Sequence, residues 1–375
     1  MKLNSLTIRC FRNYEDCEFF WHPEINIIYG KNAQGKTNLL EAVSYLSTAS
    51  SFRGQNEEKL ENWGSDFFFL EAELERDGQN ETVSAGYSQR KKLWKKNGVV
   101  CKKISDIVGF LHPVVFTPED LEIVKKGPDL RRLFLDREML QMFSGYSSYL
   151  NSYKKALLQR NNLLKQIEFE RINSETERDL LLLPWEESLS QSGAVIVQKR
   201  AAVVDRLNII AAEIHDFLSG GEEKLALQYE TTLPFVDEYS DLRDLAEQLK
   251  ASYAASRNED LRRGFTTTGP HRDDFKISIN GVDARHFGSQ GQQKTAALSI
   301  KLSEIELVKE INGYYPIVLL DDVLSELDKN RRAALLKMAF GKSQIFITTT
   351  DIDQQLLGLN DNACNKYHIV NGNLV

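Results

Sequence analysis

Residues 24–37 read EINIIYGKNAQGKT, and a strand, a loop and the start of a helix can be predicted from this stretch. Its first residues are mostly apolar up to Tyr29 and stop abruptly at Gly30, which predicts a short buried strand. From residue 37 to residue 49, apolar side chains recur at helical spacing, so a helix is predicted directly after the glycine-rich loop. A loop that links a strand to a helix in this way is the setting that the phosphate-binding pattern G-x-x-x-x-G-K-T requires.

The residues of this loop have separate expected roles. Gly30 and Gly35 allow the backbone to turn so closely that its N–H groups face phosphate oxygens, and the start of the helix adds a favourable dipole. Lys36 supplies positive charge to the β and γ phosphates, and Thr37 presents a hydroxyl to Mg²⁺, so ATP with magnesium is the expected ligand. The residues expected to bind the nucleotide here are Gly30, Lys31, Asn32, Ala33, Gln34, Gly35, Lys36, Thr37 and Asn38.

A second apolar run, PIVLLDD at 316–322, ends in two carboxylates and predicts a buried parallel strand. We expect Asp321 to hold magnesium and Asp322 to polarise the attacking water or act as its base. Successive strand residues point in opposite directions, so both carboxylates reach one site only where the backbone leaves the strand. A helix-capping turn is the alternative role. The loop and the acidic pair are expected to follow adjacent parallel strands.

The remaining patterns divide the chain into three parts. Residues 2–29 predict three strands and residues 67–100 an antiparallel meander. Heptad spacing of apolar residues from about 145, interrupted by a polar stretch and ended by two glycines at 220 and 221, predicts an antiparallel helical hairpin, either packed on itself or serving as a partner-binding arm. The expected parts are an N-terminal portion of an α/β head at 1–115, an inserted helical lobe at 116–222 and a C-terminal portion of the head at 223–375.

Composition limits the classes of partner. The formal net charge is −7, so any contact with nucleic acid has to come from a local basic patch. The four cysteines form no CxxC pair, which predicts neither a disulfide framework nor a zinc site. The first residues alternate between apolar and polar, unlike a signal peptide, and no run is long enough to span a membrane. We therefore expect a cytoplasmic protein without membrane contact.

These motifs resemble those of the SMC and RecF group of ABC-type ATPases. The stretch FRNY at 11–14 stands where that group brings an arginine and its neighbour to the nucleotide, which implies this role for Arg12 and Asn13; an ordinary turn is the alternative. SELD at 325–328 resembles the D-loop of the group, and TTTD at 348–351 stands at its switch position, although it lacks the histidine found there. Thr349 and Asp351 are thus candidates for sensing the γ-phosphate.

Residues 289–294, SQGQQK, resemble the ABC signature, which in the group contacts the γ-phosphate bound by the other subunit. Ser289 as an N-cap, followed by free N–H groups, also makes an anion site on physical grounds. The resemblance implies nucleotide contacts for Ser289, Gly291 and Gln292, with Ser289 joining Lys36 and Asp322 as a catalytic residue. One chain carries one phosphate loop and one signature, so an ATP-sandwiched homodimer is implied.

Within the group, three strings and the shortness of the helical hairpin resemble the RecF family. The strings are ASSFRG at 49–54, FTPEDLEIVKKGPDLRRLFLD at 116–136 and TTGPHRDD at 267–274. Arg53, His271 and Arg272 belong to them, and either ligand contact or a structural role is open for these three. The implied fold is an ABC-type P-loop ATPase head with an antiparallel β meander and an inserted helical-hairpin lobe.

The resemblance also implies a function. It is ATP-dependent dimerisation on DNA with weak, DNA-stimulated hydrolysis, which helps RecO- and RecR-type partners to load recombinase at gaps in recombinational repair and replication restart. Double-stranded DNA, at a gap or junction, would be bound through its backbone. An ABC-type ATPase subunit of a transporter and a P-loop small-molecule kinase are the alternatives.

Two basic runs are candidates for DNA contact, and a lysine-decorated exposed hairpin is the alternative for the first. The first run, with Trp94 interleaved, consists of Arg90, Lys91, Lys92, Lys95, Lys96, Lys102 and Lys103. The second, weaker run consists of Lys125, Lys126, Arg131 and Arg132.

Overall fold

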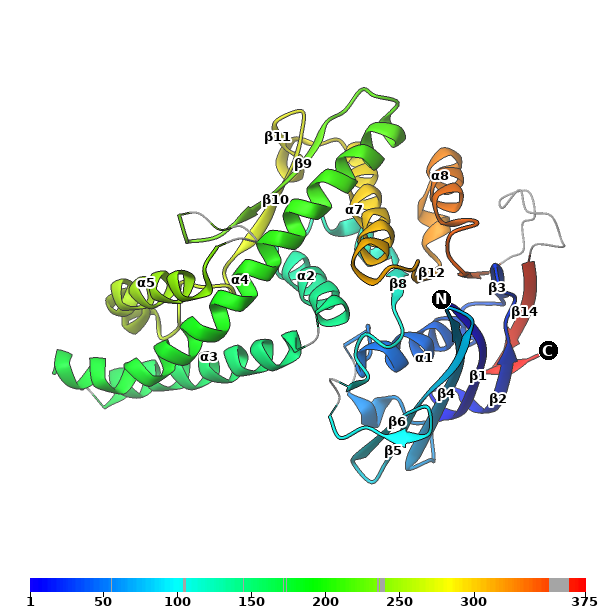
Figure 1. The fold of residues 1–375 in the computed structure, drawn as a ribbon, viewed down its shortest axis with the longest axis horizontal. Helices are drawn as coiled ribbons and strands as arrows, with labels where there is room; N and C mark the ends of the chain where they lie inside the picture. Colours follow the sequence, from blue (N-terminus) through cyan, green and yellow to red (C-terminus); the bar gives the residue numbers. More distant parts are fainter. Residues whose placement is uncertain are drawn as a thin grey trace. The chain divides into compact units, whose positions relative to one another are not determined.

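The chain forms two compact units, seen in a computed structural model (Figure 1). The first unit contains Met1–Val124, Glu213–Glu223 and Ser289–Val375, and the second contains Lys125–Ala212 and Lys224–Gly288. The structure describes residues 1–54, 56–103, 106–143, 145–170, 172, 174–234, 236, 240–350 and 364–375.

The first unit contains an antiparallel sheet with the strand order β2-β1-β4-β5-β6-β7. Its strands are β1 (Lys2–Phe11), β2 (Tyr14–Phe20), β4 (Phe67–Arg76), β5 (Gln79–Ser88), β6 (Lys91–Lys96) and β7 (Val99–Val100). One face of this sheet is apolar, as the alternating burial of β4 shows, because side chains on a strand point alternately to its two faces. The predicted meander over residues 67–100 is confirmed.

A second sheet of the same unit has the order β15-β14-β3-β13-β12-β8, and its strands from β14 to β8 run parallel. Its strands are β3 (Ile25–Tyr29), β8 (Pro113–Phe116), β12 (Ile317–Asp321), β13 (Ile345–Thr349), β14 (Cys364–Val370) and β15 (Asn373–Leu374). Strand β13 lies between β3 and β12, so the expectation that the phosphate loop and the acidic pair follow adjacent strands is wrong. Both still emerge at one edge, because parallel strands share their carboxyl ends.

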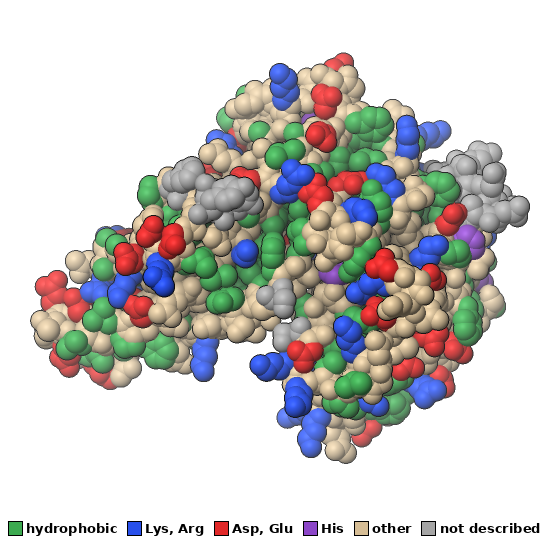
Figure 2. Space-filling view, in the orientation of Figure 1, with side chains coloured by type: hydrophobic (Ala, Val, Ile, Leu, Met, Phe, Trp, Pro, Cys, Tyr) green, Lys and Arg blue, Asp and Glu red, His purple; other side chains and the backbone are tan. Residues whose placement is uncertain are grey.

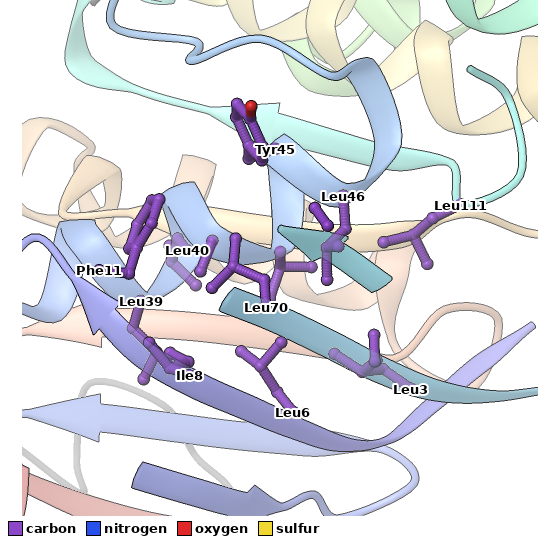
Figure 3. Packing of buried hydrophobic residues seen from close by; sticks show 14 of the residues in the cluster. Leu3, Leu6, Ile8, Phe11, Leu39, Leu40, Tyr45, Leu46, Leu70 and Leu111 are labelled. Carbon is purple, nitrogen blue, oxygen red and sulfur yellow. The ribbon is translucent and has the colours of Figure 1, made fainter. Parts of the chain in front are cut away.

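Helix α1 (Lys36–Thr48) packs against strands of both sheets and is buried along most of its length. Its apolar residues join side chains of β1 and β4 in one core, and Figure 3 shows Leu39, Leu40 and Leu46 in this cluster with Ile8 and Leu70. Residues of the parallel sheet belong to the same core. The helix that carries the phosphate loop is therefore fixed by two sheets at once.

Helices α7 (Gln290–Asn312) and α8 (Lys329–Ala339) also belong to this unit. Helix α7 packs on the 3₁₀ turn Pro118–Glu122, and α8 follows the 3₁₀ turn Val323–Glu326.

The second unit holds the predicted helical hairpin, formed by α3 (Tyr146–Phe169) and α4 (Glu175–Ser219). A fully buried ion-pair network joins them: the guanidinium of Arg160 on α3 contacts Glu186 of α4 at 3.0 Å and Asp260 of α5 (Leu242–Arg263) at 2.7 Å. Buried charges of this kind require partners on both sides, so the network fixes the pairing of these helices. Positive φ angles at Gly220 and Gly221, directly after α4, agree with its predicted end.

The boundaries of the second unit differ from the expected lobe at 116–222. The unit also takes in α2 (Pro128–Met142), β9 (Leu225–Glu230), β10 (Asp274–Ile279), β11 (Val282–Asp283) and α6 (Ala284–Phe287). The physical reason is that Arg131 of α2 donates two 2.7 Å hydrogen bonds to Asp274, which ties this helix to the strand β10 far along the chain. The last turns of α4 belong to the first unit, where His215 contacts Ser299 of α7 at 3.1 Å.

None of the described helices combines the length and the apolar character that crossing a membrane needs.

The tight turn between β14 and β15 supports the phosphate loop. Asn371 and Gly372 both have positive φ angles, as two-residue hairpin turns require. Their backbone N–H groups donate to the side chain and the backbone of Gln34, at 2.8 and 2.9 Å. A Cβ built at Gly372 would lie 2.0 Å from the carbonyl oxygen of Asn13, so this position admits only glycine without a shift of the backbone.

We expect Gly372→Ala to destabilise the protein more than Gly98→Ala. Gly98 has nearly the same φ angle, 77° against 76°, in the turn between β6 and β7, but a Cβ there meets no atom within 4 Å. Both variants carry the cost of a positive φ, whereas only Gly372→Ala overpacks, which adds roughly 1–3 kcal/mol to the loss in free energy of unfolding. Urea denaturation of the two variants measures the difference, and equal losses would contradict the contact.

Candidate nucleotide-binding site

The loop 30–37 forms the turn that its glycines predict. Gly30 and Gly35 have φ angles of 151° and 116°, a region in which other residues are strained. The ammonium of Lys36 donates to the carbonyl oxygens of Gly30 at 2.6 Å and Lys31 at 2.9 Å, so the side chain folds back over its own loop. Burial lowers the pKa of Lys36, and the carboxylates of Asp322 and Asp321 act in the opposite direction.

Thr37 and Asp321 converge as the sequence predicts. The hydroxyl of Thr37 donates to Oδ1 of Asp321 at 2.9 Å, and the hydroxyl of Thr348 donates to the same oxygen at 2.9 Å. Burial raises the pKa of Asp321, whereas these two hydrogen bonds lower it. A hydroxyl and a buried carboxylate are hard oxygen ligands of the kind that Mg²⁺ takes beside phosphates. The residues present therefore fit a magnesium ion.

Asp322 reaches the same site because the backbone leaves the strand at this residue. Its φ of 52° is left-handed, and both Asp321 and Asp322 line one cavity. The side chain of Asp322 makes no capping hydrogen bond to the 3₁₀ turn that follows, so the alternative role of the pair as a helix cap is not supported. Burial raises the pKa of Asp322, and the charge of Lys36 lowers it.

The FRNY segment is more than an ordinary turn, because it contacts the phosphate loop. Tyr14 donates its hydroxyl to the carbonyl oxygen of Gly35 at 3.0 Å, and Asn13 donates its amide to that of Gln34 at 2.9 Å. Asn13 also accepts from the amide of Asn38 at 2.8 Å. The loop is therefore held from the β1–β2 side as well as from the C-terminal hairpin.

Glu41 is a site residue that sequence reasoning missed. Its carboxylate is fully buried and forms a two-pronged ion pair with Arg12, with both N···O distances at 2.9 Å. It also accepts from the hydroxyl of Ser51 and lies 4.0 Å from the guanidinium of Arg53. A glutamate one turn into an apolar helix looks like a surface residue, and only the folded chain shows that it positions two arginines.

These groups line one cavity of about 740 Å³ in the first unit, which lies within the usual range of roughly 300–1,000 Å³ for ligand pockets. The sequence-predicted residues that line it are Arg12, Asn13, Asn32, Ala33, Gly35, Lys36, Thr37, Asn38, Asp321 and Asp322. Arg53, Lys59, Glu61, Asn62, Trp63 and Thr348 complete its described lining. The loop residues Gly30, Lys31 and Gln34 shape the backbone without lining the cavity.

The signature residues stand apart from this cavity. Ser289 is the N-cap of α7, and it exchanges hydrogen bonds with Gln292 in a capping box. Arg331 of α8 donates to the carbonyl oxygen of Gly291 at 2.9 Å and forms an ion pair with Asp328 of the SELD segment. Signature and D-loop segments are thus joined within one chain, while Ser289, Gly291 and Gln292 are absent from the described lining of the cavity.

A threonine that the sequence did not single out stands next to the predicted γ-phosphate candidate at the end of β13. Thr348, one residue before the predicted Thr349, binds Asp321 and accepts the backbone N–H of Asp322 at 2.9 Å. The predicted Asp351 lies outside the described residues.

Comparisons with known proteins give the same assignment as the motifs. A family model described as RecF/RecN/SMC N terminal domain matches residues 2–365. The DNA replication and repair protein RecF of Halalkalibacterium halodurans is 41% identical over 353 residues, which cover 94% of each chain. The chain belongs to the RecF family. Family membership decides against the transporter-subunit and kinase alternatives.

Solved structures show the same relationship. The structure of the recombination mediator protein RecF-ATP in the RecFOR pathway matches with a TM-score of 0.87 at 36% identity, covering 100% of this chain and 97% of that one. The Smc head domain of Pyrococcus furiosus matches with a TM-score of 0.54 at 14% identity, over 100% of this chain and 96% of that one. This second likeness concerns the fold alone. The predicted α/β ATPase-head class with its helical insertion is confirmed.

Two of the RecF-type string residues have structural partners in the second unit. Nε2 of His271 donates to the carbonyl oxygen of Thr266 at 3.0 Å, Nδ1 hydrogen-bonds the hydroxyl of Tyr153 at 2.7 Å, and burial lowers the pKa of His271 to about 4. Arg272 donates to the same carbonyl oxygen and lies over the ring of Phe265. Of the three string residues left open by the sequence, only Arg53 lines the nucleotide cavity.

The side chains of the first basic run that lie on β6 are divided between the two sides of this strand. Trp94 is buried and stacks on Tyr45, with ring centroids 5.4 Å apart, because alternate residues of β6 point into the core. On the same side, Lys92 pairs with Glu57 and Lys96 lies over the ring of Phe110.

On the other side of β6, Lys91 and Lys95 are exposed. Arg131 of the second run is buried against Asp274. On the face in view, Figure 2 shows Lys and Arg side chains interspersed with acidic ones and not merged into one basic field.

We expect Lys36→Met to abolish ATP binding, because the substitution keeps the approximate length of the side chain but removes the charge that faces the β and γ phosphates. Calorimetric titration with ATP and magnesium measures this directly. Lys276→Met, on the exposed face of β10, is the matched control and should bind ATP normally. Unchanged affinity in Lys36→Met would contradict the assignment of the site.

Proposed function

We propose that this RecF-family protein acts in the cytoplasm in DNA replication and repair, where ATP with magnesium drives it to form a homodimer on double-stranded DNA. The observation that carries the proposal is the 2.9 Å hydrogen bond between Thr37 and Asp321, which places a magnesium-type ligand pair beside Lys36. Relatives are named DNA replication and repair protein RecF, and one is solved as RecF-ATP.

The residues that line the cavity have separate roles in ATP binding and hydrolysis. Lys36 and the N–H groups at the start of α1 bind the phosphate oxygens, and Asp322 polarises the attacking water. Thr37 and Asp321 would hold the magnesium ion, which would supply positive charge beside the phosphates. Glu41 keeps Arg12 and Arg53 directed to the same cavity. We infer weak ATPase activity that DNA stimulates.

A second copy of the chain completes the site. The signature residues do not line the cavity of their own chain, yet the capped start of α7 is an anion-binding end that suits a γ-phosphate. Arg331 and Lys294 tie this end to the SELD segment, with Lys294 donating to the carbonyl oxygen of Glu326 at 3.1 Å. When the signature of one copy contacts the ATP bound by the second copy, this contact would therefore be transmitted to the D-loop of the first copy.

DNA is proposed to contact exposed lysines near β6 through its phosphate backbone. Lys91 and Lys95 share one side of the strand, and Lys102 and Lys103 follow the end of β7. Each contact between one of these lysines and a DNA phosphate would raise the affinity of the dimer for DNA. Such contacts are electrostatic and independent of base sequence. RecO- and RecR-type partners that load recombinase at gaps are proposed from the RecFOR pathway of the solved relative.

The direct test measures two properties of the purified protein. Size-exclusion chromatography with light scattering reports whether ATP converts monomer to dimer, and turnover assays report whether duplex DNA raises hydrolysis. A monomer whose turnover ignores DNA contradicts the proposed function.

We expect Ser289→Arg to bind ATP as a monomer but to fail to dimerise, because the bulky cation would occupy the position of the partner's γ-phosphate. The substitution also removes an N-cap, at a cost of about 1 kcal/mol. Asp241→Arg removes the N-cap of α5 in the same way and is the control, which should still dimerise. Dimerisation of Ser289→Arg, seen by light scattering, would rule out the composite site.

We expect the double variant Lys91→Gln with Lys95→Gln to bind duplex DNA more weakly than the unmodified protein. The slope of the logarithm of the binding constant against the logarithm of the salt concentration should fall in magnitude by about two, because each lost phosphate contact lowers it by roughly one. Fluorescence anisotropy over a series of salt concentrations measures the slope. Lys155→Gln with Lys165→Gln on α3 is the control for a general loss of charge. An unchanged slope in the β6 variant would place the DNA elsewhere.

A further inference from the structure

Trp63 combines two properties that rarely occur together. Its side chain is 98% exposed, and it lines the same cavity as Lys36 and Thr37. Tryptophan is highly buried on average, and the described Trp21 and Trp94 of this unit are 8% and 4% exposed. An indole left in solvent at the wall of a ligand cavity calls for an explanation from function.

The backbone that carries Trp63 is held in place although its side chain is not. Arg12 donates its N–H to the carbonyl oxygen of Leu60 at 2.6 Å, and Asn62 donates to that of Cys10 at 2.8 Å. Leu60 itself is fully buried in the core. The indole is thus presented from a segment anchored to the end of β1, so little backbone freedom would be lost when a ligand packs on it.

The lining of the cavity differs in chemistry between its contributing segments. Lys36, Thr37 and Asp321 supply the charged and hydroxyl groups that suit a triphosphate with its metal. The segment 59–63 belongs to neither the loop nor the acidic strand, and beside Lys59, Glu61 and Asn62 it contributes the aromatic plane of Trp63. A nucleoside triphosphate has the same division, with a polyanion at one end and an aromatic base at the other.

We propose that Trp63 stacks on the base of the bound nucleotide. The inference rests on the proposed function, because it takes the cavity to be the ATP site. Every base offers a π face, so stacking adds affinity without distinguishing adenine from guanine. Trp63 is therefore a positioning residue that holds the nucleoside while Lys36 and Thr37 hold the phosphates. A surface that docks on a second copy, or on a DNA base, is the competing role for an exposed indole.

The test compares ATP with inorganic tripolyphosphate, which has the phosphates but no base. We expect Trp63→Ala to weaken ATP binding about tenfold, from the loss of one base–aromatic stack, and to leave tripolyphosphate binding unchanged. GTP should weaken as ATP does. Trp63→Phe keeps a ring and should restore most of the affinity for ATP. Phe20→Ala, which removes another exposed aromatic ring on β2, is the matched control and should bind both ligands normally.

A spectroscopic readout follows the indole itself. The fluorescence of the unmodified protein minus that of Trp63→Phe reports Trp63, and we expect ATP to quench this difference while tripolyphosphate leaves it unchanged. A purely structural role would lower the affinities for ATP and tripolyphosphate together.

The outcomes separate the inference from the proposed function. If the unmodified protein binds neither ATP nor tripolyphosphate, the proposed nucleotide site fails. If it binds both, and Trp63→Ala binds ATP as tightly as the unmodified protein, only the stacking role is overturned. Loss of the ATP-dependent dimer or of DNA binding in Trp63→Ala, with the affinity for ATP intact, would assign the indole to one of the competing surfaces.

Discussion

The hydrogen bond between Thr37 and Asp321 joins the phosphate loop to the acidic strand. It joins residues that are 284 positions apart, the first at the start of a helix and the second at the end of a strand. Because α1 is packed between two sheets, the hydroxyl of Thr37 has little freedom to move. The position of β12 then fixes the carboxylate of Asp321 opposite this hydroxyl. Thr348 makes the same contact from the intervening strand, so three segments meet at one carboxylate oxygen.

Local patterns in the sequence predicted the parts of this site that depend on neighbouring residues. The strand, loop and helix around GKNAQGKT were correct, as were the hairpin α3–α4 and the N-cap at Ser289. The end of the strand at the acidic pair was also predicted, since two adjacent carboxylates had to reach one site, although the left-handed φ of Asp322 was not. Each of these features follows from periodicity or from the chemistry of a single turn.

What the sequence could not predict depends on pairing between distant segments. No local signal places β13 between β3 and β12, or assigns residues 224–288 to the same unit as the helical hairpin. Glu41 and Thr348 were missed because a glutamate in a helix and a threonine in a strand are ordinary residues until their partners are known. The sequence also did not show that Trp94, within the first basic run, faces the core.

The support of the phosphate loop by the hairpin at Asn371 and Gly372 has a consequence for synthesis on the ribosome. Both strands that pair with β3 lie beyond residue 344. The strand β3, which precedes the phosphate loop, therefore has no neighbouring strand in its sheet until those strands emerge. All segments of the second unit leave the ribosome before that point, which allows it to fold while the first unit is still incomplete. A nascent chain, or a product truncated before this hairpin, would therefore have no organised site with which to capture ATP.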